Sequence, residues 1–344
     1  MGSVKDLAVV QEPVETGTGV GRFCFSDRYS VFDWGEMPDH IENKGKAICI
    51  AAAHFFERLE GAGVRTHYRG VVEDGFTKRL RDLKKAQNTM EFQLLRVVKP
   101  RFTGEGYDYS VYKEMRENFL IPLEIIYRNS LPAGSSVFRR LREGELKPEE
   151  IGLDQIPEPG TVLAKPILDV STKLEVSDRY LTWAEAQMLC HLSDSEIEGL
   201  QRLTMLVNNL ITEEVKKVGL FNEDGKVEFG FDADRCLMVV DAVGTLDECR
   251  FTYHSLPVSK EIARIYYRKT DWYQAVETAK KRDRTNWKEI CPLKPERLPE
   301  ELRRLISQIY TTYTNELTGR EWFLSVPPLG QIMDELKGFL VRVE

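Results

Sequence analysis

The sequence lacks the residue patterns of several common protein classes. Its six cysteines are scattered and contain no Cys-x-x-Cys pair, so neither a zinc site nor a disulfide framework is predicted. Its five histidines lie too far apart along the chain to form a local metal motif. We therefore expect free thiols in a reducing cytoplasm.

A net positive charge and a long apolar run are absent as well. The chain has 48 basic and 55 acidic residues, a net charge of -7, which argues against general nucleic-acid binding. The longest apolar stretch, residues 47–56, is too short to cross a bilayer, and the first ten residues lack the apolar core of a secretion signal. We expect no nucleic-acid partner and no membrane, and we interpret 47–56 as part of a buried helix.

The chain does have enough apolar residues for a large core. It has 344 residues, 42% of them hydrophobic, in strands and helices that do not alternate as regular βαβ units. The pattern predicts an α+β fold with largely antiparallel sheets. Strands are expected at 4–10, 21–26, 93–99 and 120–128, with an irregular excursion at 101–112. Helices are expected at 44–61, 181–190, 193–218, 258–268 and 299–317, the last ending at Gly319; Ser193 and Glu196 fit a capping box.

One predicted hairpin carries two acids. Residues 226–231 alternate between apolar and polar, residues 232–234 supply a turn, and the apolar run 236–240 ends at Asp241. Pairing of these strands would bring Glu228 and Asp241 to neighbouring positions, where their charges repel unless a cation lies between them. Two interpretations remain open from these residues: a Mg²⁺ site that carries nucleotide phosphates, or a hairpin with solvated ends.

The hairpin resembles a known family when its neighbours are included. Glu228-Phe229-Gly230 followed by Asp241-Ala242-Val243-Gly244-Thr245-Leu246-Asp247-Glu248-Cys249-Arg250-Phe251 is similar to the signature of the SAICAR synthetases. Four further stretches resemble that family in the same order, and five ordered motifs are far more specific than one. These stretches are 2–7, 25–33 with 44–46, 121–129 with 133–135, and 171–175 with Asp178.

The resemblance implies a two-lobed SAICAR synthetase-like fold, similar to ATP-grasp enzymes. The implied division is an ATP-binding lobe at 1–119, a second lobe at 120–298 with a charged insertion at 270–297, and a closing helix and tail at 299–344. It also implies an activity: with ATP and Mg²⁺, the enzyme joins the carboxylate of CAIR, an aminoimidazole ribonucleotide, to the amine of L-aspartate. SAICAR, ADP and phosphate are the products, formed through an acyl phosphate in purine biosynthesis. The implied partners are these small molecules, and a homo-oligomer stays open.

The resemblance also implies roles for individual residues. Those expected at ATP are Lys5, Leu120 as part of an apolar hinge for adenine, Glu124, Glu228 and Asp241, the last two as metal ligands. Those expected to be catalytic are Lys226, Asp247 and Lys260. Those expected at the other substrates are Asp33, Lys44, Arg128, Gly134, Ser135, Lys173, Asp178, Arg250 and Arg264. The planar fork of arginine suits phosphate, and Lys260 and Arg264, at i and i+4, share one helix face.

Three departures from the family pattern leave the substrate open. Ser3 stands where a second lysine is usual, Ala242 replaces a glutamate, and Ser259 stands where an aspartate often precedes Lys260. Two alternatives therefore remain: a diverged ATP-dependent carboxylate–amine ligase with another substrate, or a nucleotide-binding protein without catalysis.

Overall fold

The computed structural model describes residues 4–283 and 286–343, so Ser3 lies outside the described residues. The α+β prediction is confirmed, since every pairing between its named strands is antiparallel. The smaller sheet has the order β1-β2-β5-β3-β4. Its strands are β1 (Lys5–Gln11), β2 (Gly19–Phe25), β3 (Tyr68–Glu73), β4 (Phe76–Lys78) and β5 (Thr89–Leu94).

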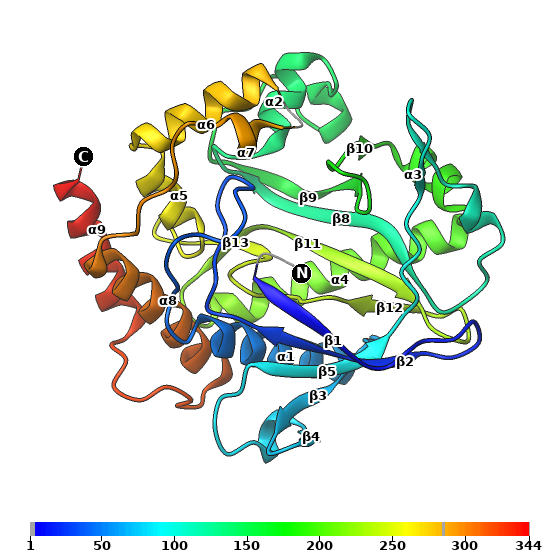
Figure 1. Ribbon diagram of the computed structural model, residues 1–344, viewed down its shortest axis with the longest axis horizontal. Helices are drawn as coiled ribbons and strands as arrows, with labels where there is room; N and C mark the ends of the chain where they lie inside the picture. Colours follow the sequence, from blue (N-terminus) through cyan, green and yellow to red (C-terminus); the bar gives the residue numbers. More distant parts are fainter. Residues whose placement is uncertain (1–3, 284–285, 344) are drawn as a thin grey trace.

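The larger sheet has the order β10-β9-β8-β11-β13-β14, and a further strand, β12, pairs with β11. Figure 1 shows it above the smaller sheet. Its strands are β8 (Phe119–Leu131), β9 (Thr161–Thr172), β10 (Tyr180–Leu181), β11 (Phe221–Phe231), β12 (Leu237–Val240), β13 (Cys249–Tyr253) and β14 (Leu256–Pro257). A separate two-stranded ribbon consists of β6 (Arg101–Phe102) and β7 (Tyr107–Asp108).

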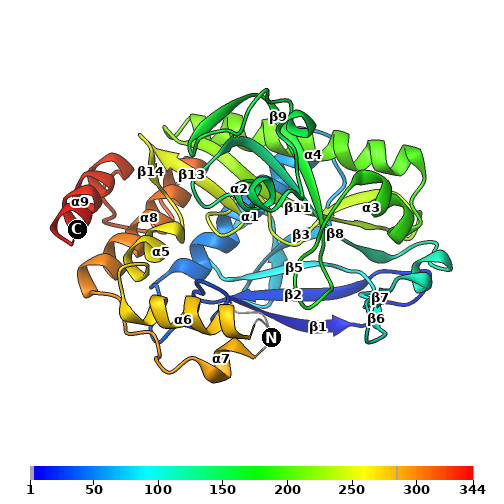
Figure 2. The ribbon, with the colours of Figure 1, turned by 90° about the horizontal axis from the view of Figure 1, so that it is seen from above.

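Helices cover both sheets. The helix α1 (Lys44–Gly61) packs on the smaller sheet, and α4 (Asp194–Lys216) packs on β8 and β11 of the larger one. Figure 2 shows the helices of the C-terminal part grouped at one end of the molecule. The remaining helices are α2 (Ser136–Glu143), α3 (Trp183–Cys190), α5 (Glu261–Tyr267), α6 (Asp271–Arg282), α7 (Trp287–Ile290), α8 (Glu300–Thr318) and α9 (Leu329–Arg342). Short 3₁₀ turns are η1 (Leu80–Asp82), η2 (Ser110–Lys113) and η3 (Pro148–Ile151).

Several local predictions are confirmed. The helix predicted at 44–61 is α1, and its residues Ala47 to Ala53 are almost fully buried. Ser193 caps α4 as predicted: its hydroxyl accepts from the amide of Glu196, whose carboxylate accepts from the amide of Ser193 at 2.8 Å. Gly319, with φ 66°, ends α8 in the left-handed conformation that favours glycine.

The prediction of a strand at 93–99 was wrong. The strand β5 ends at Leu94 because Leu94 pairs with Gly19, the first residue of β2, and the pairing with β3 already ends at Phe92. The following chain crosses to the other sheet, where Arg96 forms an isolated parallel bridge with Phe119. This bridge links the two sheets. A second isolated bridge, between Thr66 and Val239 of β12, links them again.

Two further segments hold more structure than predicted. The charged segment 270–297 contains α6 and α7, which bury Trp272 and Trp287, and the predicted tail contains α9. One continuous apolar core runs from Phe25 to Leu340 through both sheets. The division into lobes at 1–119, 120–298 and 299–344 therefore stays a prediction. None of the helices in the described part of the chain has the length and apolar character needed to cross a membrane.

Candidate functional site

The predicted carboxylate hairpin exists. Strands β11 and β12 pair with Glu228 opposite Val240, so Asp241 follows one residue after direct register. On its other side Glu228 pairs with Glu124 of β8. Asp241 has a left-handed backbone, with φ 67°, which ends β12 and is tolerated best by Asn, Asp and Gly. Three acids are thus brought to one place by three different segments.

Three lysines neutralise these acids. Lys226 lies 2.9 Å from Glu124 and 3.3 Å from both Glu228 and Glu248. Lys173 contacts Glu228 and lies 3.3 Å from Glu124, and Lys5 contacts Asp241. We call this set the lysine–carboxylate network. It consists of Lys5, Glu124, Lys173, Lys226, Glu228 and Asp241.

Burial and the neighbouring charges together determine the pKa values of the network. Burial raises the pKa of Glu228 to about 7, and the charge of Asp241 adds to this rise while Lys226 and Lys173 oppose it. Burial would also raise the pKa of Asp241, but Lys5, Lys226 and Lys173 outweigh it and the pKa falls. Burial would lower the pKa of Lys226, but Glu248, Glu228 and Glu124 reverse that and raise it. The two acids of the hairpin therefore repel one another and need cations.

The two hairpin acids suit a hard cation whose remaining ligands are phosphate and water. Glu228 and Asp241 offer carboxylate oxygens, which Mg²⁺ prefers, and Mg²⁺ commonly takes only one or two carboxylates and fills its shell with phosphate and water. No group of three or more His, Cys, Asp or Glu side chains arranged for a metal occurs within residues 4–283 and 286–343. A complete protein cage is therefore absent from the described residues, whereas a pair suited to a metal–nucleotide complex is present.

A pocket next to the network collects much of the predicted substrate set. We call it the central pocket; its volume is about 290 Å³, and Lys226 belongs both to it and to the network. Predicted site residues in its lining are Arg128, Gly134, Lys226, Asp247, Arg250, Lys260 and Arg264. The residues share one wall because β8, β11, β13 and the start of α5 converge there.

Arg250 is aimed by a buried acid. Its Nε donates to Asp224 Oδ1 at 2.7 Å, and one terminal nitrogen contacts Asp224 Oδ2. The other terminal nitrogen lies beside Gly134, 3.4 Å from where a Cβ would stand. The fork is thus fixed at one end, with its free edge toward Gly134, one of the residues expected at the substrates.

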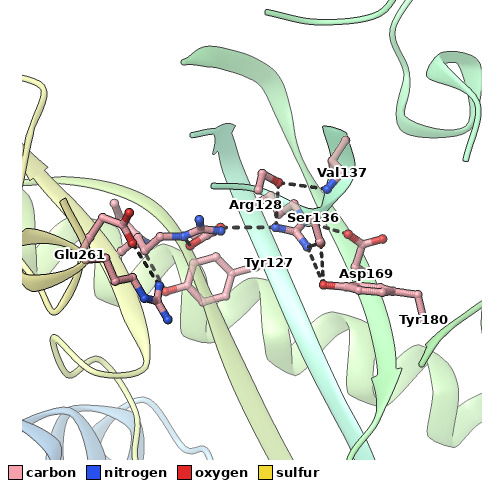
Figure 3. Close-up of polar contacts among 12 residues, drawn as sticks. Tyr127, Arg128, Ser136, Val137, Asp169, Tyr180 and Glu261 are labelled. Atoms are coloured by element: carbon pink, nitrogen blue, oxygen red, sulfur yellow. Dashed lines mark hydrogen bonds and ion pairs between the residues drawn. The ribbon is translucent and has the colours of Figure 1, made fainter. Parts of the chain in front are cut away.

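Arg128 is a buried centre of hydrogen bonds (Figure 3). Its side chain is 2% exposed, with Nε 2.7 Å from Asp169 and one terminal nitrogen 3.4 Å from Asp224. The terminal nitrogens also donate to Ser135 Oγ at 3.3 Å and to Ser136 Oγ at 3.1 Å. The expected free fork is therefore already engaged by protein atoms. Ser135 also accepts from the amide of Val137 and caps α2, a structural role beside the predicted one.

Asp247 is engaged in the same way. Lys44 donates to its Oδ2 and the Tyr310 hydroxyl to its Oδ1, both at 2.6 Å. Lys260 donates to its backbone carbonyl at 2.9 Å, and burial lowers the pKa of Lys260. Asp247 thus holds two lysines, and Lys44, buried at the start of α1, reaches the site through it rather than by projecting into the central pocket.

The Lys44–Asp247 pair makes a prediction about stability. Both side chains are buried, with 1% and 6% exposed, so Lys44→Met leaves an uncompensated carboxylate in the core. We expect the free energy of unfolding to fall by about 3–5 kcal/mol. Lys46→Met, two residues on in α1 but exposed, is the matched control and should change it by less than about 0.5 kcal/mol. Urea denaturation measures both; equal small losses would mean that the pair is energetically neutral.

The remaining predicted residues surround these two centres. Leu120 packs in a small apolar cluster with Leu95, Met238 and Val240, next to the hairpin acids. Asp178 is exposed in the loop after β9. Asp33 lies in the connection between β2 and α1 with its side chain 89% exposed. Arg264 pairs with Glu261 at 3.0 Å at the rim of the central pocket. Of the departures, Ala242 is 6% exposed in the core, and Ser259 is 2% exposed.

Sequence reasoning missed several residues of the site. Asp169, Asp224 and Glu248 hold Arg128, Arg250 and Lys226, yet none of the three acids was given a role, although Glu248 lies within the signature stretch that follows Asp241. Leu7 and Val9 are 52% and 46% exposed. Alternation along β1 places them on the face of Lys5, a signal that the sequence did contain.

Known proteins resemble this chain in sequence and in fold. A sequence model of the SAICAR synthetase family matches residues 14–281. A protein of Archaeoglobus fulgidus, provisionally named phosphoribosylaminoimidazole-succinocarboxamide synthase, is 52% identical over 340 residues, which are 99% of this chain and 100% of that protein. The SAICAR synthase of Saccharomyces cerevisiae, solved with SAICAR, is 20% identical with a TM-score of 0.63 over 94% of each chain. A SAICAR synthetase solved with ADP is 22% identical, with a TM-score of 0.56 over 86% of this chain and 99% of the other.

The two kinds of likeness carry different conclusions. At 20% and 22% identity, the solved structures establish the fold. The family match and the relative at 52% identity cover most of the chain and establish its membership. The chain belongs to the SAICAR synthetase family, the ATP-using carbon–nitrogen ligases of purine biosynthesis.

Proposed function

We propose that this protein joins the carboxylate of CAIR to the amine of L-aspartate and converts ATP to ADP and phosphate. A carboxylate is a poor acyl donor, so it first attacks the γ-phosphorus of ATP, forming an acyl phosphate as ADP leaves. The aspartate amine then attacks the acyl carbon, phosphate departs with the C–O electron pair, and the amine loses a proton. The single observation that carries the proposal is the place of Lys226, which belongs to both the lysine–carboxylate network and the central pocket.

The network is the proposed ATP side. Lys5 and Lys173 supply positive charge for phosphates, and Leu7, Val9 and the cluster around Leu120 supply apolar surface for a base. Glu228 and Asp241 would hold Mg²⁺, which when bound neutralises phosphate charge. The SAICAR synthetase solved with ADP supports a nucleotide on this fold.

The central pocket is the proposed side for the ribonucleotide and aspartate. Arg250 presents its free edge at Gly134, where a phosphate would accept from arginine and from backbone amides. Lys260 and Arg264 line the same pocket and suit carboxylates. The yeast SAICAR synthase solved with SAICAR supports a ligand of this class. Arg128 acts through Arg250, with which it shares Asp224. Asp247 acts through Lys44 and Lys260, which it holds.

The experiment is a coupled assay of ADP release. CAIR and aspartate are supplied separately and together, and the product is identified by mass. ADP release that requires both substrates, with SAICAR as product, supports the proposal. Release with CAIR and a different amine identifies a diverged ligase. ATP binding without turnover identifies a non-catalytic nucleotide-binding protein.

The proposed setting is the cytoplasm, with small molecules as partners. All six cysteines lie in the described residues and are free thiols, which suits a reducing compartment.

A further inference from the structure

The connection between β2 and α1, residues 26–43, carries an exposed acid on an unusual backbone. Phe32 and Asp33 are consecutive and both left-handed, with φ values of 55° and 61°. Such a conformation is uncommon for a residue other than glycine and persists only when its surroundings impose it. The Asp33 side chain is 89% exposed, so its own contacts do not impose it. Something else must hold this turn.

The ends of the connection are tied independently of Asp33. The Tyr29 hydroxyl donates to Asp39 at 2.7 Å and lies 3.0 Å from the hydroxyl of Tyr267 in α5. The other oxygen of Asp39 accepts from the amide of Leu298 at 3.1 Å. These bonds fix the two flanks and leave the middle, around Phe32 to Trp34, to other contacts.

Aromatic side chains from the charged segment hold the middle. The Phe32 ring lies 4.6 Å from Tyr273 and 6.1 Å from Trp272, measured between ring centroids. Trp34 lies 5.5 Å from Trp272, edge to face, and 5.9 Å from Trp287. We call Trp272, Tyr273 and Trp287 the aromatic platform. Figures 1 and 2 show α6 and α7 beside the blue connection that leads to α1.

One lysine joins the platform to the strained turn. The Lys280 ammonium of α6 lies 4.6 Å over the ring of Trp287. It donates to the carbonyl of Phe32 at 3.0 Å and lies 3.4 Å from the Asp33 carboxylate. The bond to the carbonyl fixes the peptide between the two left-handed residues. The contact with the exposed carboxylate is weaker, because surface ion pairs contribute little.

Asp33 is one of the residues that the family resemblance implies at the substrates. It lies in the connection between β2 and α1 with its side chain 89% exposed, so its carboxylate is accessible to a ligand. A misplacement of about 1 Å at such a position can cost on the order of a hundredfold in rate.

We propose that the α6–α7 segment is a positioning device for Asp33, and that Lys280 on the aromatic platform is its positioning residue. The identity of the substrate that Asp33 meets rests on the proposed function. The positioning itself does not, since it depends on contacts within the protein.

Amide hydrogen exchange tests the positioning without any substrate. The Trp34 amide donates to Val31 at 3.1 Å within the turn, whereas those of Met37 and Ile41 donate to Tyr29 and Asp27 at the flanks. In Lys280→Met we expect exchange at Trp34 to accelerate about tenfold, with Met37 and Ile41 unchanged. Lys281→Met, the exposed neighbour on α6, is the control and should leave all three unchanged. Unchanged exchange at Trp34 in Lys280→Met would overturn the proposal.

Kinetics then test what the positioning achieves. We expect Lys280→Met to lower kcat/KM for CAIR by about ten- to a hundredfold, to leave the KM for ATP unchanged, and Lys280→Arg to restore most of the loss. Because Lys280 acts through Asp33, the Lys280→Met/Asp33→Asn double variant should lose no more than the worse single variant. Losses that add, or an equal loss in Lys281→Met, would overturn it. If the wild type makes no SAICAR, the proposed function fails while the exchange result still decides the positioning.

Discussion

We expect Asp241→Asn to abolish most turnover, with kcat lower by roughly two to three orders of magnitude, while the protein remains folded. Asp241 belongs to the lysine–carboxylate network through Lys5, and its charge is one of the two that we propose to hold Mg²⁺. An amide keeps the shape but cannot supply anionic charge to a hard cation. The variant should also lose the dependence of ATP affinity on Mg²⁺ in calorimetric titration.

The choice of asparagine isolates the charge. Asp241 has φ 67°, a conformation that asparagine also adopts readily, so the substitution adds little backbone strain. The carbonyl of Asp241, which accepts from His67 at 3.1 Å, is unaffected. Asp234→Asn, at an exposed position in the turn of the same hairpin, is the matched control and should retain wild-type activity. Wild-type turnover in Asp241→Asn would remove that residue from the metal site.

The hairpin shows what local sequence patterns can predict. The alternation before Gly230 and the apolar run ending at Asp241 determine two paired strands, because period and turn are properties of neighbouring residues. Helix α1 and the cap at Ser193 are predictable for the same reason. Glu228 pairs with Val240, so Asp241 lies at a neighbouring position, as predicted.

The partners of the site residues were beyond such patterns. Asp169 and Asp224, which hold Arg128, lie 41 and 96 residues from it, and Asp247 lies 203 residues from Lys44. No local periodicity relates residues at such separations. The sequence identified charged residues suited to ligands, but whether a charge meets a ligand or another side chain depends on the packed fold.

The charged segment shows the same limit from the opposite side. It was expected only as a charged insertion, yet Trp272 is 3% and Trp287 is 7% exposed. Charged residues on one face of α6 leave the other face free to bury aromatic rings. What the rings pack against is the connection of Phe32 and Trp34, more than two hundred residues earlier, which only tertiary structure reveals.

Arg250→Lys should weaken the ribonucleotide far more than ATP. Lysine keeps a positive charge but loses the fork that grips Asp224 through two nitrogens and presents a third toward Gly134. A charge-assisted hydrogen bond contributes about 1.5–3 kcal/mol, so we expect the KM for CAIR to rise by roughly ten- to a hundredfold. Steady-state kinetics with each substrate varied in turn measure it, and the KM for ATP should stay within about twofold of the wild type.

Arg250 tests the phosphate site more cleanly than Arg128 does. Arg128 is buried and engaged with Asp169, Asp224 and two serines, so its replacement removes protein contacts and should cost stability before it reports on a ligand. When Arg250 is replaced, Asp224 keeps Arg128 as a partner. One terminal nitrogen of Arg250 has no hydrogen bond among the described residues, so it is free to meet a ligand. Arg268→Lys is the control, since Arg268 is 39% exposed, pairs with Glu261 and is not among the residues that line the central pocket. Equal losses for ATP and CAIR in Arg250→Lys would make Arg250 a structural residue, and the phosphate would then have to bind elsewhere in the pocket.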